Sequence, residues 1–231
     1  KPHFSQEEFA LVVELLTKKW SPDQISNTLR LQNLLTISHE TIYRYIWRDK
    51  KEGGQLFMHL RHAVKKRRKR YGAYDSRGIM SGKRLIDHRP LSADNRSRKG
   101  HFEVDTIMGR GSKHCAMTLV DRKTGYLVIR KLRRRTTAEV NAELQKIIEG
   151  GKHRFRTITA DNGTEFHQYE QIEERTGTLF YFARPYHSWE RGSIENANGL
   201  IRQYLPKTKP MTHLTQAECD AIATELNERP R

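Results

Sequence analysis

Residues 101–132 read HFEVDTIMGRGSKHCAMTLVDRKTGYLVIRKL, three apolar segments separated by short polar links. The segments are rich in β-branched and aromatic residues, and Gly111-Ser112 and Lys123-Thr124-Gly125 supply turn residues, so strands are expected over 101–108, 115–120 and 126–132. Strands joined by such short links pair antiparallel. The stretch therefore predicts a three-stranded antiparallel meander.

Helical and strand patterns alternate after the meander. A helix is expected from Thr136 or Thr137 to the glycine pair at 150–151. A strand over 155–160, a helix over 169–175, a strand over 178–182 and a further helix follow. This order is that of the ribonuclease H fold. The expected class is α/β, with a mixed five-stranded sheet flanked by helices forming a catalytic domain over residues 100–231.

The first 49 residues indicate a small all-α domain. Ser5 with Glu8, and Ser21 with Gln24, match capping boxes, and a third helix is expected from Ser38. Three short helices with a polar last helix are typical of a helix-turn-helix domain that reads DNA. A trihelical packing module is the alternative, because the link over 31–37 is longer than usual. The residues expected to contact DNA are His39, Glu40, Thr41, Tyr43 and Arg44.

The composition favours a polyanionic partner. Lys and Arg total 43 against 27 acidic residues, a formal net charge of +16, which attracts DNA or RNA. A ribosomal or membrane-surface protein also fits the charge alone. Residues 50–99 are expected to be a basic linker that contacts DNA, with a merely solvated charged run as the alternative. Its densest part is Lys65, Lys66, Arg67, Arg68, Lys69 and Arg70.

Other sequence features argue against a zinc-binding, a disulfide-rich or a membrane protein. Only Cys115 and Cys219 are present, with no C-x-x-C pair. No apolar stretch approaches the length of a membrane span, and the N-terminus lacks a signal-peptide pattern. A cytoplasmic protein with reduced thiols and no membrane partner is expected.

Three acidic residues occupy positions suited to metal-dependent phosphodiester chemistry. Asp105 lies within the first expected strand, Asp161 ends the fourth, and Glu195 opens a helix. Hard carboxylate oxygens suit Mg²⁺ or Mn²⁺, and two such ions can activate an oxygen nucleophile and stabilise the leaving oxygen. Asp105 would bridge the two ions. Taken singly, each acid also fits a turn, an ion pair or a helix start.

Three other acids compete with this assignment. Asp121 lies beside a turn and Glu165 follows Asp161 closely. Glu103 shares a strand face with Asp105, because alternate residues of a strand point the same way. Glu103 is therefore the strongest competitor.

The stretch over residues 184–207, RPYHSWERGSIENANGLIRQYLPK, resembles the glutamate motif of the insertion-sequence-thirty family of bacterial DDE transposases. TADNGTEF at 159–166 and SHETIY at 38–43 support the resemblance, which covers most of the chain. These transposases belong to the ribonuclease H-like superfamily of retroviral integrases. The resemblance implies that Asp105, Asp161 and Glu195 are the catalytic metal-binding triad, acting with magnesium in DNA cleavage and strand transfer.

The resemblance also implies binding to terminal inverted repeats and target DNA as a homodimer or larger multimer. Trp189 equally fits a core position. The residues for which the motif implies supporting or DNA-contacting roles are Asn162, Trp189, Arg191, Asn198 and Arg202.

The chain departs from the family pattern in two respects. Val104 and Thr106 stand where glycine and leucine are more usual. Family members usually begin earlier and end later, so an internal fragment is expected. A ribonuclease H-like nuclease that only hydrolyses, and a non-catalytic DNA-binding regulator derived from a transposase, are the alternative functions.

Overall fold

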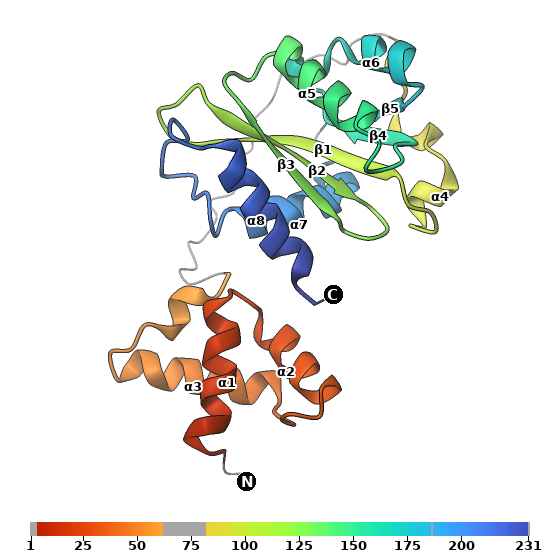
Figure 1. Cartoon of the computed structure of the whole chain (residues 1–231). Coiled ribbons are helices and arrows are strands. Elements are labelled where there is room, and N and C mark those ends of the chain that lie inside the picture. The colour runs from red at the N-terminus through yellow and green to blue at the C-terminus, as the bar shows by residue number, and fades with distance from the viewer. Residues whose placement is uncertain (1–3, 62–81, 186, 231) are drawn as a thin grey trace. The chain divides into compact units, whose positions relative to one another are not determined.

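The structure is a computed structural model that describes residues 4–61, 82–185 and 187–230, so the basic run at 65–70 lies outside it. The chain divides into a helical unit, Lys1–Tyr74 with Glu228–Arg231, and a sheet unit, Asp75–Asn227 (Figure 1). Across the described ranges, none of the helices is both long and apolar enough to cross a membrane.

The helical unit contains the three expected helices, α1 (Gln6–Thr17), α2 (Pro22–Leu31) and α3 (His39–Lys51). Both capping boxes are formed, and Ser38 caps α3 by accepting from the backbone of Thr41. The 3-10 turn η1 (Leu56–His59) packs against the same core. The fully or almost fully buried residues of this core are Val12, Leu16, Ile25, Leu29, Leu35, Ile37, Ile42 and Ile46.

The sheet unit is built on five strands in the order β3-β2-β1-β4-β5. The meander β1 (His101–Met108), β2 (Cys115–Asp121) and β3 (Leu127–Leu132) is antiparallel, as the sequence predicts. The strands β4 (Thr157–Ala160) and β5 (Leu179–Phe182) add in parallel on the other side of β1. This is the mixed five-stranded sheet of a ribonuclease H-like core.

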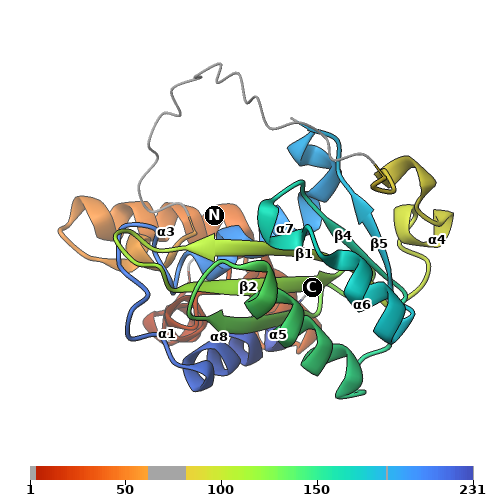
Figure 2. The ribbon, with the colours of Figure 1, turned by 90° about the horizontal axis from the view of Figure 1, so that it is seen from above.

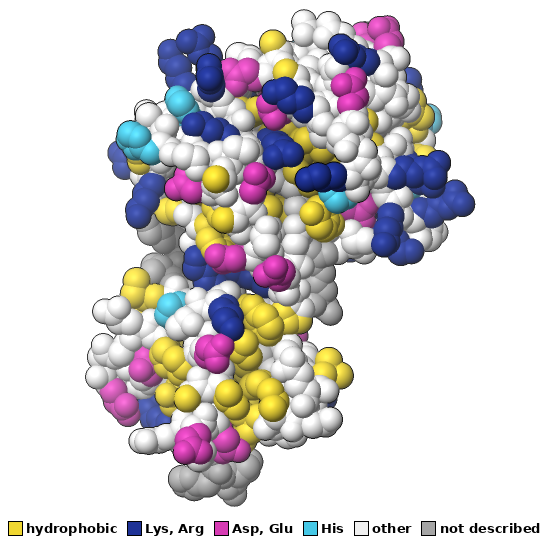
Figure 3. Space-filling view, viewed as in Figure 1, with side chains coloured by type: hydrophobic (Ala, Val, Ile, Leu, Met, Phe, Trp, Pro, Cys, Tyr) yellow, Lys and Arg dark blue, Asp and Glu magenta, His cyan; other side chains and the backbone are white. Residues whose placement is uncertain are grey.

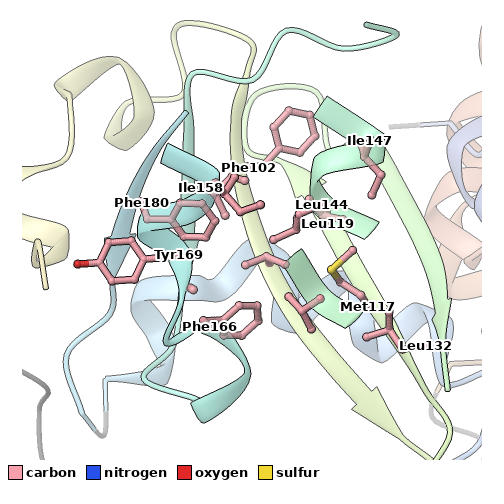
Figure 4. Close-up of a cluster of buried hydrophobic side chains, with 14 of the residues drawn as sticks. Phe102, Met117, Leu119, Leu132, Leu144, Ile147, Ile158, Phe166, Tyr169 and Phe180 are labelled. Carbon is pink, nitrogen blue, oxygen red and sulfur yellow. The ribbon is translucent and has the colours of Figure 1, made fainter. Parts of the chain in front are cut away.

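Helices cover both faces of the sheet (Figures 1 and 2). The helices α5 (Thr137–Glu149) and α6 (Tyr169–Thr176) pack on one face, where the close-up in Figure 4 shows Phe102, Leu119, Leu144 and Phe180 within one apolar cluster. On the opposite face, α7 (Gly192–Ile201) and α8 (Gln216–Glu228) enclose a second cluster. Because side chains of β1 alternate between these faces, one set joins the first core and the other is directed at α7.

Residues 82–99, within the expected linker, pack on the sheet unit. Beyond η2 (Ile86–His88), the short helix α4 (Leu91–Asp94) buries Ala93 completely. The backbone N–H of Phe182 donates to Arg84, and Leu85 pairs in parallel with Phe182, so this segment covers the β5 edge of the sheet. Covered edges cannot template pairing with other chains.

The other sheet edge is covered by α8, a helix absent from the sequence-based expectations. The Gln216 side chain accepts a hydrogen bond from the backbone N–H of Lys131 and donates one to the carbonyl of Ile129. The Asn227 side chain accepts from the backbone N–H of Leu127 and donates to the carbonyl of the same residue. Two side-chain amides thus satisfy hydrogen-bonding groups of β3 that a neighbouring strand would otherwise pair.

Candidate active site

Asp105 lies in the middle of β1 with its carboxylate directed at α7. Its Oδ1 accepts from the backbone of Thr106 at 2.8 Å, and its Oδ2 accepts from Nδ2 of Asn198 at 2.9 Å. Oδ1 of Asn198 in turn accepts from the Thr118 hydroxyl at 2.8 Å, which fixes how the amide faces the carboxylate. Burial raises the pKa of Asp105 above its ordinary range, opposed by Arg191 and reinforced by the nearby Asp161.

Asp161 follows directly after β4, the strand parallel to β1, so the fold carries it to the same region as Asp105. Its Oδ1 accepts from the backbone N–H of Gly163 at 2.8 Å. A Cβ at position 163 would lie 2.4 Å from Oε2 of Glu165 and 2.8 Å from Oδ1 of Asp161. A larger residue here would require the carboxylates of Asp161 and Glu165 to shift from these positions.

Arg191, just before α7, lies between the two aspartates. Its Nη2 donates to Oδ2 of Asp161 at 3.3 Å, and its Nη1 lies 4.0 Å from Oδ1 of Asp105. Nη1 also donates to the backbone carbonyl of Val104 at 3.1 Å. Only 8% of the residue is exposed. A cation therefore already occupies the space that the two carboxylates face.

Glu195 lies on α7 three residues before Asn198, so the two share a side of the helix. Its side chain is exposed. Among the residues that the structure describes, no group of three or more His, Cys, Asp or Glu side chains is placed to bind one ion. The structure thus brings Asp105 and Asp161 together around a cation and leaves Glu195 on the neighbouring helix.

Glu103 has a different environment from Asp105 on the same strand face. It is completely buried, forms an ion pair with Arg122, and accepts from the backbone N–H of Ile194 in the first turn of α7 at 2.8 Å. A carboxylate at a helix N-terminus satisfies a free N–H and favours the helix dipole. Both oxygens of Glu103 are therefore used to hold α7 on the sheet.

The other two competing acids also have structural partners. Asp121 accepts from the backbone of Gly100 at 2.6 Å and from the turn at 123–124, so it holds the start of β1 and the β2–β3 turn. Glu165, 1% exposed, pairs with Arg135 and accepts from the Thr106 hydroxyl at 2.8 Å through Oε1. Its Oε2 is buried without a hydrogen-bond partner among the described residues.

Two further cations border the aspartates. The Lys83 ammonium lies 4.2 Å over the ring of Phe182, and Asp161 and Glu165 oppose the lowering of its pKa that burial causes. Burial also lowers the pKa of Arg202, and Asp105 opposes that shift. Sequence reasoning missed Lys83 because it precedes β1 in an apparently unstructured segment.

The remaining residues of the motifs have mixed roles. Asn162 donates from Nδ2 to the carbonyl of Ala183 at 2.9 Å, tying the end of β4 to that of β5. Arg202 donates to the carbonyl of Leu205 at 3.2 Å. Trp189 is 69% exposed, so it is not a core residue, and its ring lies 4.5 Å from that of His187.

In the helical unit, the expected DNA contacts lie in the first two turns of α3. His39, Glu40, Tyr43 and Arg44 are exposed, and Thr41 is partly exposed. Trp47, one turn beyond Tyr43 and 42% exposed, extends this face and was not singled out from the sequence. Its position could have been found from the i, i+4 spacing alone.

Basic side chains are distributed over the sheet unit on the face seen in Figure 3. Some have acidic partners, such as Arg130 with Asp220 at 3.3 Å. The overall excess of 43 basic over 27 acidic residues leaves a surface suited to a polyanion.

Comparison with protein families gives a match to the family described as Integrase core domain over residues 95–188. This range contains Asp105 and Asp161. Among solved structures, the catalytic core domain of BIV integrase aligns at a TM-score of 0.45 and 17% identity, covering 57% of this chain and 86% of that chain.

Bacterial transposases resemble the chain over almost its whole length. The transposase for insertion sequence element IS4351 of Bacteroides fragilis is 42% identical over 220 residues, which are 95% of this chain and 68% of that protein. Transposase InsI for IS30C of Escherichia coli (strain K12) is 39% identical, covering 96% and 60%. The transposase for IS1086 of Cupriavidus metallidurans is 36% identical, covering 96% and 68%. The chain spans about two thirds of the length of these relatives.

Proposed function

Because this chain belongs to the IS30 family of DDE transposases, we propose that it cleaves DNA at the terminal inverted repeats of an insertion sequence and joins the ends to target DNA. The observation that carries this proposal is the pair of aspartates at neighbouring strands, held around one cation. Such a site at the carboxyl end of a parallel strand is suited to phosphodiester chemistry, and the basic surface is suited to its substrate.

The donor set of the site fits a divalent metal ion. Asp105 and Asp161 offer hard oxygen ligands, and the Arg191 guanidinium between them stands in for a cation. We propose that Asp105, Asp161 and Glu195 hold two magnesium ions, with manganese as a substitute. When bound, such ions supply Lewis acidity that activates an oxygen nucleophile and stabilises a leaving oxygen.

The protein's own residues position these ligands. Asn198 and the backbone N–H of Thr106 each donate a hydrogen bond to one oxygen of Asp105, and together they fix the orientation of the carboxylate. Glu103 holds the first turn of α7, the helix that carries both Asn198 and Glu195. Supporting contacts of this kind limit the movement of ligands and so favour a reactive geometry.

DNA binding is proposed to use the exposed side of α3 and the basic run at 65–70. Helix-turn-helix domains place their last helix in the major groove, while Lys and Arg bind phosphates without reading sequence. A homodimer or larger multimer, which would bring one copy of the site to each DNA end, is also proposed.

The test is magnesium-dependent cleavage and joining of a duplex that carries the terminal repeat. Asp161→Asn is expected to lower cleavage by at least about 100-fold, because a ligand that stabilises charge in the transition state is lost. Asp220→Asn, a change at an exposed acid of α8, serves as the control and should retain activity. Full cleavage by Asp161→Asn would refute the assignment. Cleavage without joining would indicate a nuclease, and DNA binding without either reaction a regulator.

A further inference from the structure

Arg191 makes long contacts with both aspartates and a shorter one with the backbone carbonyl of Val104. Its distance of 3.3 Å to Asp161 is long for a charge-assisted hydrogen bond, and the 4.0 Å to Asp105 is beyond hydrogen-bond range. The bond to the Val104 carbonyl, at 3.1 Å, does not depend on either carboxylate. A guanidinium bound in this way neutralises charge without the paired geometry of a permanent ion pair.

The surroundings explain why a positive charge is needed at this position. Asp105 and Asp161 expose only 22% and 35% of their side chains, and the fold holds them facing the same space. Glu165 adds a further buried carboxylate nearby, which has its own partner in Arg135. Like charges brought together at a partly buried site repel, and a cation between them removes that repulsion.

We propose that Arg191 is a resident counter-ion, a guanidinium that holds Asp105 and Asp161 together in the metal-free protein and competes with the divalent ion for them. The inference rests on the proposed function, since it requires that these aspartates bind metal. A long, flexible side chain can move its guanidinium away while the backbone stays in place. The competition is thermodynamic: whatever the metal must displace reduces its affinity.

Direct binding of Mn²⁺ to the full chain without DNA tests this inference. Arg191→Gln removes the positive charge, and its shorter side chain also gives up the bond from Nη1 to the Val104 carbonyl. It is expected to bind Mn²⁺ at least about tenfold more tightly than the unaltered protein, a conservative figure for deleting a unit charge about 4 Å from a ligand. Arg191→Lys keeps the charge and should bind Mn²⁺ with nearly unaltered affinity.

Arg130→Gln is the matched control. Arg130 on β3 also lies 3.3 Å from a carboxylate, that of Asp220 on α8, and its replacement by Gln changes the net charge by the same amount. Its Mn²⁺ affinity should remain unaltered. Equal tightening in this variant and in Arg191→Gln would mean that net charge alone acts, and would overturn the role assigned to Arg191.

Asp161→Asn separates failure of the inference from failure of the proposed function. If this variant binds Mn²⁺ as well as the unaltered protein, the aspartates are not the metal site and both proposals fail. If it loses binding while Arg191→Gln shows no tightening, the metal site stands and only the counter-ion role is refuted.

The melting temperature, measured with and without Mn²⁺, provides a second test. It distinguishes a counter-ion from an arginine that only supports the structure, because only the effect of a counter-ion should depend on the metal. Arg191→Gln should lower the melting temperature without metal, because the carboxylates then repel each other. Saturating Mn²⁺ should remove most of that difference, since the ion takes over the neutralisation. A stability loss of the same size with and without Mn²⁺ would instead assign Arg191 to bracing the Val104 carbonyl.

Discussion

Replacing Glu103 by Gln tests whether the two acids on one face of β1 have different roles, Glu103 in stability and Asp105 in metal binding. The Glu103 carboxylate is completely buried, paired with Arg122 and bonded to the backbone of Ile194. Glutamine can still accept from Ile194, but it leaves the Arg122 guanidinium, itself 8% exposed, without its opposite charge. The variant should therefore lose stability and retain Mn²⁺ binding at the proposed site.

The expected size of the loss follows from burial of the pair. Removing one partner of a buried ion pair costs about 3–5 kcal/mol, because the remaining charge is left without compensation. Arg122 keeps one bond, from Nε to the carbonyl of Ala93 at 2.8 Å, which favours the lower end of that range. For a domain of roughly 150 residues, each kcal/mol shifts the melting temperature by about 2–4 °C.

The assay is urea unfolding of the full chain, which gives the free energy of unfolding and its slope with denaturant. Glu143→Gln is the control, since Glu143 pairs with Lys146 on the surface of α5 and should contribute less than about 1 kcal/mol. A loss below about 1 kcal/mol for Glu103→Gln would refute the reasoning from buried charge. Abolished Mn²⁺ binding in a normally stable variant would show that Glu103, rather than Asp105 alone, holds the ion.

Three further outcomes are expected. Gly163→Ala should reduce DNA cleavage by about 100-fold, because its methyl group displaces the carboxylates of Asp161 and Glu165. Gly192→Ala is the control: a Cβ at position 192 meets no atom within 4 Å, so this variant should change cleavage little. Burial raises the pKa of Cys115 to about 11 and that of Cys219 to about 12, so neither thiol should react with a disulfide reagent until the protein is unfolded. Burial lowers the pKa of His101, so the folded state favours the neutral ring and stability should fall as the pH drops below about 6.5; His101→Gln should flatten that dependence in urea titrations.

Much of the fold was predictable because its signals are local. Helix caps at Ser5, Ser21 and Ser38 involve residues three positions apart, and the strands of the meander follow from short apolar runs with turns between them. Both kinds of signal depend on neighbours along the chain. The structure confirms these elements to within one or two residues, apart from the missed helices.

The elements that were missed depend on contacts far along the chain. The helix α8 is positioned by its contacts with β3. The side chain of Gln216, for example, donates a hydrogen bond to the carbonyl of Ile129, 87 positions earlier in the chain. The segment around Arg84 looked like a linker because its partner is the edge of β5, which the sequence does not place beside it. Composition cannot reveal such pairings, since they depend on the order of strands in the sheet.

For the site, the sequence by itself determined the candidate acids and the motifs that carry them. Only the tertiary structure decided how they are used. It joins Asp105 to Asn198 across 93 positions and places Arg191 between the two aspartates, while it assigns Glu103 to Arg122 and the start of α7. The physical reason is that a carboxylate's role depends on the charges and donors around it in space, and strand order and helix packing bring those together.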